Sequence, residues 1–146
     1  MITTVDVETS WQKNENGGYD PSPFHPDNIL VSVGINDEYY FTNHSERIDR
    51  GCYHNIQSIL DKTTLLVGHN IKFDLMWLLE SGFKYNGRVY DTMLGEYLLN
   101  RGIRKSLTLE MSCRRRKIGS KDTSVKEWMD RGVSFENIPK DIVEEY

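Results

Sequence analysis

The chain begins, after Met1, with the run Ile2-Thr3-Thr4-Val5-Asp6-Val7-Glu8-Thr9, whose β-branched residues are typical of a β-strand. Side chains alternate between the two faces of a strand, so Asp6 and Glu8 are expected on the same face. Two neighbouring carboxylates repel, and one of them would be driven to protonate unless a cation neutralised the pair. Hard divalent cations such as Mg²⁺ or Mn²⁺ take oxygen ligands, so this strand predicts a metal-binding pair of acids.

A third acid follows in Leu65-Leu66-Val67-Gly68-His69-Asn70-Ile71-Lys72-Phe73-Asp74-Leu75-Met76-Trp77-Leu78-Leu79. This pattern predicts a short apolar strand, a turn and an amphipathic helix over residues 71–80. Asn70 and Asp74 are four positions apart, which predicts that both lie on one face near the start of this helix. The start of a helix favours anions and offers backbone N–H groups to a phosphate.

The rest of the chain completes an α/β pattern. Strands are expected over residues 29–35, 39–42 and 88–90, and a helix is expected over residues 50–62. Residues 11–27 predict a long loop beside the first two acids, and the chain from Ser106 onward is helical in pattern. Three antiparallel strands followed by alternating helices and strands predict a mixed sheet flanked by helices.

Length and composition limit the function classes. The 146 residues suit one domain that buries a core, and the formal net charge is −4. The two cysteines, Cys52 and Cys113, are expected to be reduced thiols. The sequence predicts no signal peptide and no membrane span, so a cytoplasmic location is expected.

Basic residues gather in one part of the chain. Eight lysines and arginines lie between Arg101 and Lys121, where Glu110 is the single acid. The run Arg114-Arg115-Arg116 is either a solvated helical face or a patch that contacts phosphates.

Several other residues have expected structural roles. Asp91 is expected to cap the following helix rather than to serve as a fourth metal ligand. His69 is expected to pack or to form hydrogen bonds beside the site, because hard oxygen-liganded metals do not call for imidazole. A helical spacing predicts core positions for four more residues, Trp77, Leu78, Phe83 and Tyr97.

These motifs resemble those of the DEDD 3′-5′ exonucleases, a superfamily named after its four acidic residues. The segment Asp6-Val7-Glu8-Thr9 is similar to the first motif, and residues 70–74 are similar to the second. Residues 89–100 resemble the stretch that follows the second motif in the proofreading domain of family A DNA polymerases. In the tyrosine subtype the third motif is Tyr-x-x-x-Asp on a helix, and Tyr146, the last residue of the sequence, matches its tyrosine.

The resemblance implies a ribonuclease H-like fold and a set of functional residues. Asp6, Glu8 and Asp74 would bind two ions, Mg²⁺ or Mn²⁺, together with the motif aspartate that would follow Tyr146. Tyr146 and Glu8 would orient the attacking water. The terminal nucleotide would be held by Thr9, Trp11 and Asn70, with Trp11 stacking on a base. The domain, residues 1–146, is expected to be incomplete at its C-terminus and nearly inert without that aspartate.

Three functions are open at this point. The first is the proofreading exonuclease domain of a family A polymerase, which would act on the 3′ end of single-stranded DNA. A phage type, and with it the host cytoplasm, is expected because the first motif lies almost at Met1. The second is an inactive fragment that binds single strands or a partner chain carrying the polymerase and the missing helix. The third is an RNA exonuclease of the ribonuclease D kind. The segment Asp91-Thr92-Met93-Leu94 favours the first over the third.

Overall fold

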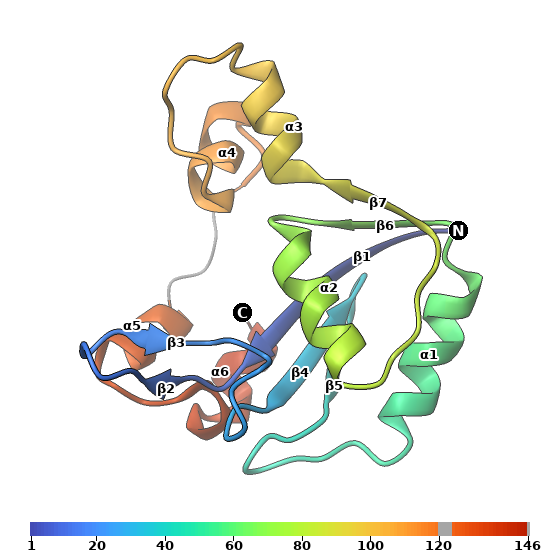
Figure 1. Cartoon of the computed structure of the whole chain (residues 1–146), viewed down its shortest axis with the longest axis vertical. Coiled ribbons are helices and arrows are strands. Elements are labelled where there is room, and N and C mark those ends of the chain that lie inside the picture. Colours follow the sequence, from blue (N-terminus) through green and yellow to red (C-terminus); the bar gives the residue numbers. More distant parts are fainter. Residues whose placement is uncertain (120–123, 146) are drawn as a thin grey trace.

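A five-stranded mixed sheet forms the centre of the computed structural model, which describes residues 1–119 and 124–145 (Figure 1). Its order is β5-β4-β1-β6-β7. Antiparallel pairs join β1 to β4 and β4 to β5, and parallel pairs join β1 to β6 and β6 to β7. The strands are β1 (Ile2–Thr9), β4 (Leu30–Ile35), β5 (Glu38–Phe41), β6 (Leu65–Gly68) and β7 (Arg88–Asp91). The predicted α/β fold is therefore confirmed.

Helices cover both faces of this sheet. On one face, α1 (Cys52–Lys62) and α2 (Ile71–Glu80) pack against Val5, Val7 and Val33. On the other face, α5 (Ser124–Asp130), the 3₁₀ helix η1 (Phe135–Asn137) and α6 (Lys140–Glu145) supply apolar side chains that pack against strands β4 and β5. This mixed sheet with its flanking helices is consistent with a ribonuclease H-like exonuclease fold.

Two helices project beyond the sheet at the end of β7 (Figure 1). They are α3 (Thr92–Leu99) and α4 (Leu109–Arg116). The prediction of a core position for Tyr97 is wrong, because α3 packs beside α4 instead of over the sheet and leaves Tyr97 55% exposed. Trp77, Leu78 and Phe83, which were predicted with it, are buried.

The predicted long loop contains a small hairpin. Its strands are β2 (Gln12–Lys13) and β3 (Tyr19–Asp20), which pair antiparallel. The Asn14 side chain closes the turn by accepting the N–H groups of Asn16 and Gly18. The hairpin segment is tied to the sheet domain because Trp77 Nε1 donates to the carbonyl oxygen of Pro21 at 3.0 Å.

Two boundaries depend on backbone conformation. Helix α1 begins at Cys52, after Gly51 at φ 76°, and not at Arg50 as the periodicity predicts. Helix α2 begins at Ile71 as expected, after Asn70. Within the part of the chain that the structure describes, no helix combines the length and apolarity needed to cross a bilayer.

Candidate active site

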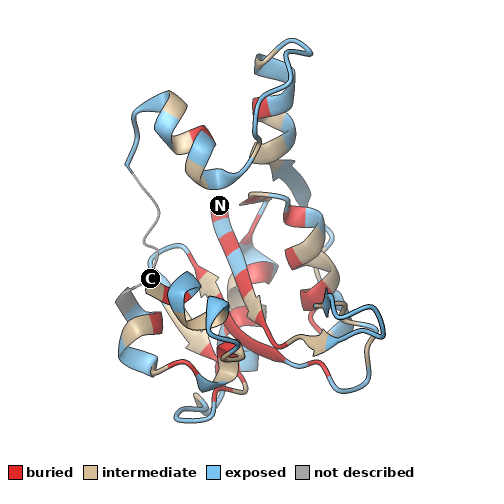
Figure 2. Ribbon diagram, turned by 90° about the vertical axis from the view of Figure 1, so that its left-hand side faces the viewer, coloured by how far each residue is buried: buried red, intermediate tan, exposed pale blue. Residues whose placement is uncertain are grey.

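Strand β1 presents its acids on one face and its apolar residues on the other. Burial alternates along the strand, visible as alternating bands in Figure 2. Val5 and Val7 are buried against α1 and α2, whereas Asp6 is exposed and Glu8 is half-buried. Asp6 and Glu8 therefore share the face opposite α1 and α2, as the alternation predicts.

Asp74 reaches β1 from the first turn of α2. Asp74 is 3% exposed, and its Oδ1 accepts the backbone N–H of Val7 at 3.0 Å. The ladder between β1 and β6 covers only Ile2–Thr4 on the β1 side, so β1 continues past the end of this pairing. The side chain of Asp74 thus satisfies a backbone donor of β1 between the two acids of that strand.

A glycine allows this close approach of α2 to β1. A Cβ atom at Gly68 would lie 3.0 Å from Ile71 Cγ1 and 3.2 Å from the carbonyl oxygen of Val5. Contacts that short would force the turn between β6 and α2 away from β1. Glycine at this position therefore helps to bring Asp74 to the strand.

The carboxyl group of Asp74 has an unusually high pKa. Burial is the largest cause, the negative charge of Asp6 is the second, and together they raise the pKa of Asp74 to about 7. The hydrogen bond from Val7 acts in the opposite direction. Asp6 and Asp74 are thus close enough to repel each other, and a bound cation would relieve this repulsion.

These acids fit a divalent cation in part. The repulsion between Asp6 and Asp74, and the oxygen chemistry of both, suit a hard metal ion. Among the described residues, however, no three His, Cys, Asp or Glu side chains converge closely enough to hold one ion. The set of Asp6, Glu8 and Asp74 as metal ligands stays a prediction. Tyr146, the other predicted catalytic residue, lies outside the described residues.

The position of Asn70 corrects one inference from spacing. Asn70 precedes α2 in the left-handed conformation, at φ 63°, so it does not share a helical face with Asp74. Its backbone N–H donates to Asp91 Oδ1 at 3.0 Å, and its side chain is exposed. Asp91 Oδ1 also accepts the N–H of Met93 at 2.8 Å, which confirms the predicted cap of α3.

His69 acts as a connector between segments. Its Nδ1 lies 2.9 Å from Thr92 Oγ1 and its Nε2 lies 2.7 Å from the carbonyl oxygen of Leu107. Thr92 Oγ1 in turn donates to the carbonyl oxygen of Gly68. The expected hydrogen-bonding role is confirmed, and it ties the turn before α2 to α3 and to the segment before α4.

The two other predicted nucleotide contacts differ in accessibility. Thr9 is buried at the end of β1, where a bulge interrupts the pairing with β4. Trp11 is half-buried and makes an edge-to-face contact with Tyr19, with ring centroids 4.1 Å apart. Together with Met129 of α5, these two rings line a hollow of about 320 Å³. The roles of Thr9 and Trp11 toward a nucleotide stay predictions.

The three arginines of α4 have acidic partners. Arg116 Nε donates to Glu96 Oε1 at 2.7 Å, and Arg115 Nη2 donates to Glu96 Oε2 at 3.1 Å. Arg114 pairs with Glu110 one turn away at 3.3 Å, and its side chain is 71% exposed. Arg115 and Arg116 therefore connect α4 to α3, while Arg114 is the most open of the three to a phosphate.

Replacing Glu96 by glutamine should loosen the contact between α3 and α4. Arg116 first, and Arg115 second, lower the pKa of the Glu96 carboxyl, so the contact is present at neutral pH and is lost as the pH falls through that lowered pKa. Amide hydrogen exchange should become faster in residues 92–116 of the variant but not in β1. The control is Glu110→Gln, which breaks an exposed pair of little value. Equal exchange in the two variants would contradict this role of Glu96.

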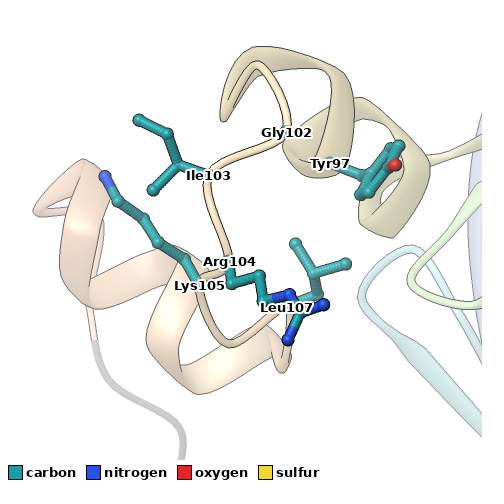
Figure 3. Close-up of a pocket in the computed structure, with 6 residues that line it drawn as sticks. All are labelled: Tyr97, Gly102, Ile103, Arg104, Lys105 and Leu107. Carbon is teal, nitrogen blue, oxygen red and sulfur yellow. The ribbon is translucent and has the colours of Figure 1, made fainter.

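A second group of basic residues borders a hollow after α3. The hollow has a volume of about 480 Å³ and is lined by Tyr97 of α3 and by residues of the following loop, Gly102, Ile103, Arg104, Lys105 and Leu107 (Figure 3). All of these except Leu107 are exposed. An exposed aromatic ring beside two cations is an arrangement that suits a nucleic-acid strand.

The family of the chain follows from a match over most of its length. A family model described as 3′-5′ exonuclease, of the DNA polymerase A type, matches residues 15–113. The chain belongs to the DEDD 3′-5′ exonucleases of this type. No curated protein matches it.

The family match supports the assignment of some site residues more directly than that of others. It includes Asp74 and Asp91 and begins after Asp6 and Glu8, whose placement rests on the geometry of β1. The family consists of two-metal exonucleases, which implies the use of divalent metal ions.

The structure adds two features that the sequence does not reveal. Asp91 accepts hydrogen bonds from both Asn70 and Met93, and Tyr39 lies beside the acids of β1. The alternation of side chains along β5 does not by itself reveal the position of Tyr39, because that position depends on the register of β1, β4 and β5.

Proposed function

We propose that this exonuclease removes nucleotides from the 3′ end of single-stranded DNA and serves as the proofreading part of a family A DNA polymerase of phage type. The observation that carries this proposal is the approach of Asp74 to Asp6 across the end of β1, within a chain of the 3′-5′ exonuclease family. A buried carboxylate whose pKa is raised by a neighbouring acid is common at functional sites.

The residues of the site have separate tasks in this proposal. Asp6, Glu8 and Asp74 would hold divalent ions, Mg²⁺ or Mn²⁺, and such ions would supply activation of a water and stabilisation of the leaving 3′ oxygen. Glu8, half-buried on the same face as Asp6, orients the attacking water, and Tyr146 shares this task. Trp11 stacks on a base near the 3′ end. The ring of Tyr97 and the cations Arg104 and Lys105 would hold the strand further away from the acids.

One further candidate is a binding fragment that requires a partner chain. It is favoured by the absence, among the described residues, of three acids that converge on one ion. Such a fragment would bind single strands or a separate polymerase chain without cleaving DNA. An RNA exonuclease of the ribonuclease D kind is the other alternative.

The test is release of nucleotides from a 5′-labelled single strand in the presence of Mn²⁺. It compares this chain with an extended chain that carries aspartate four positions after Tyr146. We expect stepwise shortening from the 3′ end by the extended chain. Phosphorothioate linkages at the 3′ end should block the reaction and serve as the substrate control.

Three outcomes would change the conclusion. Faster release from RNA of the same sequence would favour the ribonuclease D kind. Tight binding without cleavage by the extended chain would favour the binding fragment. Cleavage that starts from the 5′ end would contradict the proposed reaction altogether.

A further inference from the structure

The lobe formed by α3, α4 and their connecting loops, residues 92–118, is attached to the sheet by polar contacts. It projects from the end of β7, away from the helices that cover the sheet (Figure 1). Among the described residues, neither of the two apolar clusters that pack on the sheet contains a residue of this lobe. The orientation of the lobe therefore depends on the hydrogen bonds at its point of attachment.

Within the described part of the chain, three hydrogen bonds join the lobe to the turn before α2. His69 Nδ1 lies 2.9 Å from Thr92 Oγ1, and His69 Nε2 lies 2.7 Å from the carbonyl oxygen of Leu107. Thr92 Oγ1 donates to the carbonyl oxygen of Gly68 at 3.1 Å. His69 thus holds both the start of α3 and the loop that leads into α4.

The two segments that His69 holds also line the hollow after α3. Leu107 lines this hollow directly, and α3, which begins at Thr92, carries Tyr97 into its lining (Figure 3). The turn that contains His69 leads into α2, from which Asp74 contacts β1. One side chain therefore connects the hollow to the helix that carries an acid of the site.

The hydrogens needed for these contacts determine the charge of His69. A carbonyl oxygen can only accept, so Nε2 must donate to Leu107, and the Thr92 hydroxyl must give its single hydrogen to Gly68. Nδ1 then has to donate to Thr92 Oγ1. All three bonds exist together only when both ring nitrogens carry hydrogen and His69 is positively charged. A neutral ring must give up one of the three.

The charged groups around the ring leave room for this positive charge. A hollow of about 250 Å³ between α3 and α4 brings His69 together with four titratable residues, Tyr90, Glu96, Cys113 and Arg116. The charge of Arg116 is paired with that of Glu96. Asp91, the last residue of β7, places a negative charge beside the backbone of Asn70, the residue that follows His69.

We propose that His69 is a positioning residue of the strand-binding surface. With both ring nitrogens carrying hydrogen, it holds the lobe against the turn before α2 and thereby fixes the hollow around Tyr97 relative to the acids. Loss of one ring hydrogen loosens the lobe and weakens the binding of a single strand. The inference rests on the proposed function in what it states about DNA, whereas the attachment of the lobe is tested without DNA.

The first experiment examines the attachment in the chain of 146 residues. Nitrogen-15 NMR of the imidazole ring and amide hydrogen exchange are measured from pH 5 to pH 8, the range over which imidazole changes its charge. We expect both ring nitrogens of His69 to carry hydrogen at the pH where residues 92–118 are best protected. Protection, the ratio of intrinsic to observed exchange rate, should fall in the lobe and not in β1 when one ring hydrogen is lost.

Two variants separate the ring charge from the contact itself. A glutamine in His69→Gln can donate to Leu107 and accept from Thr92 but carries no charge, so protection of its lobe should not follow pH in this range. His69→Ala should lower protection of the lobe at every pH. The control is His54→Gln, which removes an exposed histidine from α1 and should behave as the unaltered chain. The same pH dependence in His69→Gln and the unaltered chain would overturn the role of the ring charge, and so would a His69 ring with one hydrogen throughout.

The second experiment measures the affinity for a labelled oligothymidine strand in EDTA, by fluorescence anisotropy. We expect His69→Ala to weaken binding by about tenfold, which corresponds to a hollow correctly placed in about a tenth of the molecules, and His54→Gln to leave binding unchanged. The slope of affinity against salt should be equal in His69→Gln and the unaltered chain. A slope smaller by about one in His69→Gln would show that His69 itself contacts a phosphate and would overturn its positioning role. Absence of binding by the unaltered chain, with ring and exchange results as expected, would contradict the proposed function and leave the attachment by His69 in place.

Discussion

Replacing Asp6 by alanine should lower Mn²⁺-dependent nucleotide release by the extended chain by roughly 10² to 10³-fold, the usual cost of removing one preorganised electrostatic contact at a transition state. Asp6 is the acid that lies on the open face of β1 and also repels Asp74, so it is in reach of an ion shared by both. The measurement is the initial rate of release from a labelled single strand, at saturating Mn²⁺.

Loss of folding would not explain this result. Asp6 is exposed, and removing it takes away a negative charge that raises the pKa of Asp74. The matched control is Asp37→Ala, which removes an exposed acid from the turn between β4 and β5. Equal rates in the two variants would contradict the assignment of Asp6 to the site.

Replacing Asp74 by asparagine should stabilise the metal-free protein at pH 8. The pKa of Asp74 is about 7 in the folded chain and 3.8 in the reference state, so the folded state binds the proton more tightly. The bound proton contributes its full stabilisation of the folded state below pH 4, and this contribution is lost as the pH rises to about 7. An amide carries no charge and can keep the hydrogen bond from Val7, so the variant should avoid this loss.

The expected gain at pH 8 is at most about 4 kcal/mol, at 1.36 kcal/mol for each pKa unit. Urea unfolding in EDTA at pH 4 and pH 8 measures it, and the two proteins should differ only at the higher pH. Mn²⁺ should then stabilise the unaltered chain and not Asp74→Asn, because an ion that binds only the folded state adds stability. Asp37→Asn is the control. A variant that is less stable than the unaltered chain at pH 8 would show that Asp74 serves the fold through its negative charge.

Local pattern predicts the sheet and the acids of β1 for a physical reason. The alternation of β1 determines which face each side chain occupies, and the apolar strand before Ile71 predicts both β6 and the start of α2. These features depend on neighbours in sequence. Gly34, by contrast, matters only through Tyr39 and Asp6, which meet it across strands, and pattern within one strand does not reveal such contacts.

A helical spacing predicts the wrong position for residues whose packing depends on backbone conformation or on an ion pair. Asn70 takes a left-handed conformation and leaves the helical face that its spacing predicts. Tyr97 follows a helical period, yet its helix is bound to α4 through Glu96 and stays away from the core. Charge alone also suggests that Arg115 and Arg116 are available to phosphates, because sequence does not show that both contact one carboxylate.

The attachment of α3 to α4 by charge affects how DNA binding should be measured. Among the residues that the structure describes, three ion-pair contacts involve α4, two of them to Glu96, and several apolar side chains of α3 are exposed. Added salt screens such contacts, and it also weakens binding to phosphates. A plot of affinity against salt concentration would then combine release of counterions with loosening of these helices. Glu96→Gln, measured over the same range, would separate the two contributions, because its helices are already loosened at low salt.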